Sequence, residues 1–84
     1  MTTTATAGHI RYTMMIQWSD EDRAYVVSLP EWEGRVFNPV THGATYEEAA
    51  KNGLEVLEGV IAVALDHGEP LPEPSGLRPL ASVE

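Results

Sequence analysis

One long helix with a recognisable start constrains this chain more than any other feature. Thr45 is a good N-cap residue and Glu48 falls at the third helical position, which is the pattern of a capping box. Gly68, with His67 in the turn before it, suits the C-terminal end. The sequence predicts a helix of about 22 residues, roughly 33 Å long. Its predicted apolar face consists of Ala50, Leu54, Leu57, Ile61, Ala64 and Leu65.

The residues before this helix alternate between apolar and polar side chains. From 10 to 18 the even positions are apolar, and Met15 is the one apolar side chain among the odd positions. Such alternation is typical of a half-buried strand. A second alternating stretch covers 24–29 and ends at Pro30, because proline cannot donate to a sheet. The polar residues 19–23 between them predict a hairpin turn.

A third strand is predicted to begin at 35–37 and to continue at 40–41, with Pro39 placing it at an edge or a bulge. Residues 42–44 are predicted to form a turn. The predicted fold is α+β, with a three-stranded antiparallel sheet and one long helix. A fourth, short edge strand has room at the C-terminal end. The expected organisation is a disordered tail (1–9), one domain (10–76) and a C-terminal tail or edge strand (77–84).

The charge of the chain favours a basic protein as its partner. Its 84 residues include 13 acidic and 5 basic side chains, for a net charge of −8. Affinity for phosphate backbones comes mainly from lysine and arginine, whereas opposite potentials steer protein encounters. We therefore expect no direct binding of nucleic acid. The basic residues are scattered singly, at Arg11, Arg23, Arg35, Lys51 and Arg78.

Two further features bear on compartment. There is no cysteine, which excludes disulfides. Residues 1–8 do not resemble a signal peptide, and the longest uncharged run of the helix, 59–65, is too short to cross a bilayer. The expectation is a soluble, cytoplasmic protein that does not associate with membranes.

The sequence contains no recognisable catalytic or metal-binding motif. His9, His42 and His67 lie far apart, without the close spacing of metal ligands. Residues 20–22 are all acidic, but the alternation of a calcium loop is missing, and aspartates favour turns because they bond the local backbone. No nucleophile, base and orienting group come together. We expect no enzymatic activity, no metal and no cofactor.

Trp32, between Glu31 and Glu33, allows two interpretations. Tryptophan is enriched at interface hot spots, and acidic neighbours suit a basic partner. Alternatively, Trp32 packs over the open end of a small core. The residues alone do not choose between these.

Three valines next to the predicted helix face suggest self-association. Val56, Val60 and Val63 make the second half of the helix apolar over more than one face. Such a surplus usually marks a second contact, and a chain this short gains stability from sharing an interface. We predict a homodimer or a higher homo-oligomer.

Several segments, taken in order, resemble the HicB family of antitoxins. The resemblance covers residues 10–76, and no single segment is specific by itself. Its parts are the acidic turn 20–22, Tyr25-Val26-Val27, Leu29-Pro30-Glu31, Gly34, Thr41-His42-Gly43-Ala44-Thr45-Tyr46-Glu47-Glu48-Ala49, and Gly68-Glu69-Pro70-Leu71-Pro72-Glu73-Pro74-Ser75.

The resemblance implies a ribonuclease H-like partial fold and the role of antitoxin in a type II toxin–antitoxin pair. It implies, as partner, a small basic mRNA-cleaving toxin of the HicA type, inhibited by direct binding. The predicted contact residues are Asp20, Glu21, Asp22, Glu31, Trp32 and Glu33. The alternative is an orphan of the family, a homo-oligomeric regulatory or structural protein without a toxin.

The chain departs from the family pattern in two places. Many members continue into a helix-turn-helix or ribbon-helix-helix module, and a chain that ends at Glu84 is expected to be a short form without one. The stretch 34–43 is longer than usual, with 37–40 as the additional residues. Ribonuclease H chemistry needs a carboxylate on the first strand to help hold divalent metal, and 10–18 contains none, so an inactive scaffold is expected.

Overall fold

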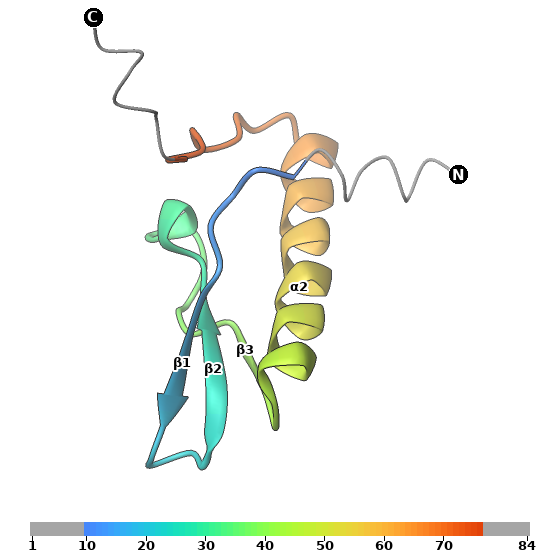
Figure 1. Cartoon of the computed structure of the whole chain (residues 1–84). Coiled ribbons are helices and arrows are strands. Elements are labelled where there is room, and N and C mark those ends of the chain that lie inside the picture. The colour runs from blue at the N-terminus through green and yellow to red at the C-terminus, as the bar shows by residue number, and fades with distance from the viewer. Residues whose placement is uncertain (1–9, 77–84) are drawn as a thin grey trace, which may run out of the picture.

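The computed structural model describes residues 10–76, so both predicted tails and the fourth strand considered for 77–83 lie outside the described residues. Three strands form an antiparallel sheet in the order β1-β2-β3, and α2 packs against one of its faces (Figure 1). This confirms the predicted α+β fold with one long helix. The elements are β1 (Met15–Ser19), β2 (Ala24–Ser28), the 3-10 turn η1 (Pro30–Trp32), β3 (Thr41–Gly43) and α2 (Tyr46–Asp66).

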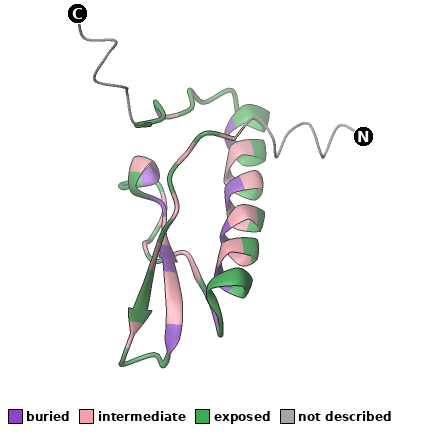
Figure 2. Cartoon of the chain, viewed as in Figure 1, coloured by how far each residue is buried: buried purple, intermediate pink, exposed green. Residues whose placement is uncertain are grey.

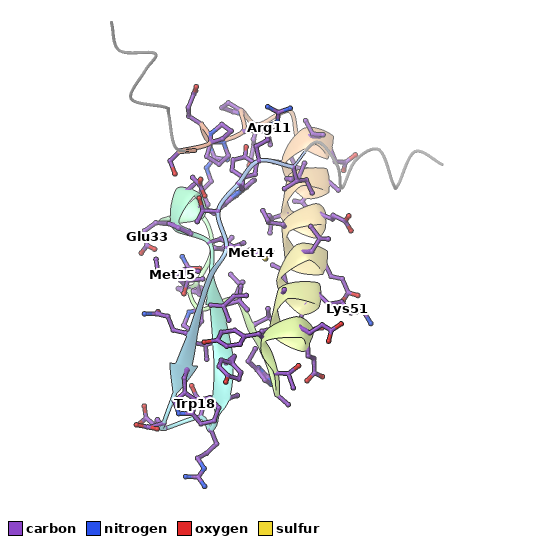
Figure 3. All side chains as sticks on the ribbon, in the orientation of Figure 1. Arg11, Met14, Met15, Trp18, Glu33 and Lys51 are labelled. Atoms are coloured by element: carbon purple, nitrogen blue, oxygen red, sulfur yellow. The ribbon has the colours of Figure 1, made fainter. Side chains whose placement is uncertain are left out.

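The first hairpin is confirmed, but β1 begins later than predicted. Met15 pairs with Ser28, where β2 ends. The chain then turns into η1 at Pro30, so residues 10–14 lie beyond the end of β2 and pair with no strand in the described part of the chain. Their alternation still determines packing: Met14 contacts the core, whereas Met15 is 44% exposed and points away from α2 (Figure 3).

The third strand lies further along the chain than predicted. β3 pairs Thr41 with Val27 and Gly43 with Tyr25, so the predicted strand at 35–37 and the predicted turn at 42–44 are wrong. Non-local pairing with β2 decides this position. The loop before β3 is braced by Asn38, whose Oδ1 accepts from the Leu29 N–H at 2.8 Å and whose Nδ2 donates to the Leu29 carbonyl at 3.2 Å.

Both ends of α2 are confirmed. Thr45 Oγ1 accepts a hydrogen bond from the Glu48 N–H at 3.0 Å. Glu48 Oε1 in turn accepts from the Ala44 N–H at 2.7 Å, one residue before the usual position in a capping box. At the other end Gly68 has φ +70°, and the N–H of Glu69 donates to the Ala64 carbonyl at 2.9 Å. That bond and the left-handed glycine form a Schellman motif.

The buried face of α2 is rotated from the predicted one. Leu57 and Ala64 are buried as expected, but Leu65 is 62% exposed and the small residues Ala49 and Gly53 are buried. The buried parts of α2 lie on its side towards the sheet (Figure 2). Gly53 sets the approach of helix to sheet. A Cβ there would lie 2.9 Å from Val27 Cγ1 and 2.6 Å from Met14 Sδ. The helix therefore comes closest to the sheet at small residues. A prediction that counts only large apolar residues misses this part of the buried face. No helix in the described part of the chain is long and apolar enough to span a membrane.

The core continues beyond the sheet, under the second half of α2. Leu29, Trp32, Leu57 and Ala64 form a buried cluster there. The segment after the helix crosses from the end of α2 towards η1 (Figure 1). Tyr12 donates a hydrogen bond of 2.6 Å to the Pro72 carbonyl in this segment. Partial burial, and then the charge of Glu31, raise the pKa of Tyr12, so its hydroxyl keeps the proton that it donates.

Candidate functional site

Three aromatic rings form an exposed row where the hairpin extends past the first turn of α2. Trp18 and Tyr25 are cross-strand partners, and Tyr46 is the first residue of α2. Trp18 meets Tyr25 edge to face at 5.1 Å between centroids, and Tyr25 lies 4.2 Å from Tyr46. Trp18 is 51% exposed and Tyr46 is 62% exposed. We call these three residues the aromatic row.

The acidic hairpin turn, residues 20–22, follows β1 directly after Trp18 and Ser19 and lies beside the aromatic row. Trp18 marks this end of the hairpin in Figure 3. Asp20 Oδ1 accepts a hydrogen bond from Trp18 Nε1 at 2.8 Å, which joins the turn to the row. Asp22 Oδ2 accepts from the Ser19 hydroxyl at 3.0 Å, and the Asp22 N–H donates to the same hydroxyl oxygen at 3.1 Å. Two of the three acids thus also stabilise the turn, and all three remain exposed. Row and turn together are the hairpin-end surface.

The predicted contact loop, residues 31–33, does not join this surface. It lies in and after η1, at the other end of β2 from the hairpin turn (Figure 1). The structure therefore divides the six predicted contact residues into two separate groups.

Glu31 binds other parts of its own chain. One carboxylate oxygen, Oε2, accepts from the Ser75 hydroxyl at 2.8 Å, the Ser75 N–H at 3.0 Å and the Thr13 hydroxyl at 3.0 Å. The other, Oε1, accepts from the Thr13 N–H at 3.0 Å. Partial burial raises the pKa of Glu31, but these hydrogen bonds outweigh it and lower the pKa to about 2. Glu31 thus joins its own segment to those of Thr13 and Ser75, which are distant in sequence.

Trp32 packs inside the protein, which is the second of the two interpretations that the sequence allowed. It is 2% exposed, with the Tyr12 ring edge-on at 5.4 Å and the Arg35 guanidinium 5.5 Å from the ring centroid. Its Nε1 is buried without a hydrogen-bond partner in the described structure. The prediction that Trp32 is a surface anchor is therefore wrong. Glu33 is exposed on the side away from α2 and accepts from Asn38 Nδ2 at 3.0 Å (Figure 3).

The three valines of the predicted oligomer interface line one groove. Val56, Val60 and Val63 form its helix wall, and Trp32 and Val36 lie opposite in a cavity of about 700 Å³. Val56 and Val60 also contact the core of their own chain, whereas Val63 is 55% exposed. Their part in self-association stays a prediction.

The predicted absence of a metal site stays a prediction too. Within residues 10–76 no three His, Cys, Asp or Glu side chains are grouped to hold an ion. His42 is exposed on β3, where its carbonyl accepts from Asn52 Nδ2 at 2.8 Å. His67 caps the C-terminal end of α2, and His9 lies outside the described residues.

Comparisons with protein families, curated proteins and solved structures give no match for this chain.

Proposed function

We propose that this protein is an antitoxin-like binding module that inhibits a small, basic, mRNA-cleaving toxin by covering it. The HicB-like order of residues suggests this role. The observation that carries the proposal is the hairpin-end surface, where Trp18 and Tyr46 are more than half exposed beside the carboxylates of residues 20–22.

A surface of this composition suits lysine and arginine side chains. Exposed rings attract a cation over their faces, by about 0.5–1 kcal/mol in water and about 2 kcal/mol once water is excluded. The rings can pack against the apolar stems of these side chains, and the carboxylates of the turn can pair with the cationic heads. A basic loop or helix of a partner is therefore the best complement.

Inhibition follows from the chemistry of the partner. A ribonuclease holds its polyanionic substrate with lysine and arginine. An acidic surface that covers those side chains displaces the RNA. The net charge of −8 also accelerates the encounter with a basic protein and disfavours binding of this chain to RNA or DNA. We place the pair in the cytoplasm, with no role for membranes or cofactors.

The test is the affinity of this protein for the product of the adjacent gene, which the proposal expects to be a small basic protein. Trp18→Ala removes the most exposed ring of the hairpin and is expected to weaken binding at least tenfold, as hot-spot aromatics do. Met15→Ala is the matched control, because Met15 is exposed on the same strand but points to the other side (Figure 3). Equal affinities for the two variants would place the contact elsewhere. Absence of any complex would remove the proposal.

The valine groove favours a second candidate, a homo-oligomeric regulatory or structural protein that has no toxin. Co-expression with the neighbouring gene separates the two. Rescue of growth together with co-purification supports the antitoxin, whereas self-association without either effect supports the orphan protein.

A further inference from the structure

Phe37 is the most exposed large apolar side chain in the described structure, at 96%. Its loop is nevertheless well braced. Asn38 bonds both backbone groups of Leu29, and the N–H groups of Arg35 and Val36 both donate to the Trp32 carbonyl, at 2.9 and 3.1 Å. A phenylalanine held out from a fixed loop exposes apolar area that a partner surface can bury without first ordering the loop.

The groove described above reaches the residue before Phe37 in the chain. Val36, the neighbour of Phe37, lines the groove opposite Val56, Val60 and Val63. Gly59 also lines it, and a Cβ at that position would meet no other atom within 4 Å. The groove is therefore wide at its helix wall, with space for a side chain that residues 10–76 do not supply.

We propose that two copies of this chain form a two-fold symmetric homodimer in which Phe37 of each copy inserts into the groove of the other. A two-fold contact uses the same patch on both copies, so a projecting side chain and its receiving groove must lie close together. Phe37 and Val36 satisfy this condition because they are adjacent in the chain.

The charges at the groove are self-complementary under the same symmetry. Arg35 and Glu69 both line it. A two-fold arrangement that exchanges Phe37 puts the charges of one copy at the groove of the other, where Arg35 can pair with the partner's Glu69 twice. A patch with one cation and one anion thus matches a second copy of itself.

The area available suits a modest dimer. A buried aromatic side chain removes about 150–250 Å² from water, so two inserted phenylalanines contribute roughly 300–500 Å². A stable interface buries about 1,600 Å² in total. Val63 and the remaining groove walls have to supply the rest of the buried area.

Salt distinguishes this dimer from the proposed toxin complex. Each copy carries a net charge of −8, so the two copies repel each other and added salt strengthens the dimer. A complex between the hairpin-end surface and a basic protein has the opposite dependence. Either interaction can therefore fail without the other.

Sedimentation of the full chain, at micromolar concentrations and in low and high salt, tests the proposal. Phe37→Ser and Gly59→Phe are each expected to leave a folded monomer, the first by removing the inserted ring and the second by filling the groove. Gly59→Ala is the control and is expected to dimerise as the original chain does, because a methyl group leaves the groove open. Circular dichroism verifies that each variant is folded.

Mixing the two disruptive variants tests the insertion itself. The Phe37→Ser chain retains an open groove and the Gly59→Phe chain retains its Phe37, so together they restore one of the two insertions. We expect a heterodimer that is weaker than the original dimer but tighter than either variant alone. A monomeric original chain at all salt concentrations, a dimer that survives both substitutions, or folded variants that fail to complement would each overturn the proposal. The proposal would also be overturned if the groove bound the basic protein and no second copy of this chain.

Discussion

Replacement of Glu31 by glutamine should destabilise the protein in a pH-dependent way. The carboxylate accepts hydrogen bonds from Thr13 and Ser75 and so joins η1 to the segments on either side of the domain. Glutamine has nearly the same shape, but it presents an NH₂ group where one oxygen stood. That group cannot accept from the donors of Thr13 or Ser75, so at least one of them loses its partner.

The size of the effect follows from the pKa of Glu31. Its ordinary value of 4.5 falls to about 2 in the folded protein. One pKa unit corresponds to about 1.4 kcal/mol, so a drop of this size sets an upper limit of roughly 3 kcal/mol on the stabilisation. Solvent screens a carboxylate that is only partly buried, and we therefore expect about 1–2 kcal/mol. For a domain of this length that corresponds to a loss of roughly 5–15 °C in Tm.

The sign of the pH dependence is fixed by the direction of the shift. Because the folded-state pKa is lowered, the stabilisation is fully present above about pH 4.5 and is lost as the pH falls towards 2. Thermal unfolding of the original chain and of Glu31→Gln between neutral pH and pH 2 measures it. The difference in Tm should be constant near neutrality and should shrink below pH 4.5.

Glu55→Gln is the control, because Glu55 is an exposed glutamate on α2 and the substitution makes the same change of charge. It should change Tm by little at any pH. Two results would refute the reasoning: a Glu31→Gln protein as stable as the original at pH 7, or a difference that persists undiminished at pH 2.

Two further predictions concern packing. Trp32→Ala should cost about 3–5 kcal/mol, as removal of large buried aromatics does, and should abolish cooperative unfolding in a domain this small; a folded variant would show that the core does not depend on this ring. On α2, Gly53→Ala should destabilise the protein by about 1–2 kcal/mol because the added Cβ meets Val27 and Met14. Gly59→Ala should instead stabilise the protein by about 0.5–1 kcal/mol, because alanine has the higher helix propensity and its Cβ meets no other atom there. Denaturant titrations that give both substitutions the same sign would contradict the packing described for Gly53.

Local signals in the sequence predicted local structure well. The N-cap at Thr45 and the glycine after α2 depend on residues within one helical turn, and the structure confirms both, with the Glu48 carboxylate bonding the N–H one residue before the cap. The position of β3 and the start of β1 were predicted wrongly, because both depend on where β2 ends and which backbone it meets. Neighbouring residues do not carry that information.

The candidate site was predicted in part. The acidic residues 20–22 predict the turn, but alternation alone gives Trp18 and Tyr25 the apolar, core-facing positions of their strands. They do alternate as the pattern requires, yet the hairpin extends past the first turn of α2 and leaves them half covered. Trp32 shows the converse, since its acidic neighbours suggested a surface while tertiary packing buries it. Whether an aromatic side chain is exposed depends on which distant segments pack over it, and the neighbouring residues do not determine that.

The most direct test of the central claim is to titrate the product of the adjacent gene, which the proposal expects to be a basic ribonuclease, with this chain and to measure RNA cleavage. We expect the original chain and Met15→Ala to suppress RNA cleavage at near-stoichiometric amounts. Trp18→Ala should require at least tenfold more protein for the same suppression. Cleavage that continues unchanged in excess original chain, or suppression that is identical for all three proteins, would contradict a toxin-covering role for the hairpin-end surface.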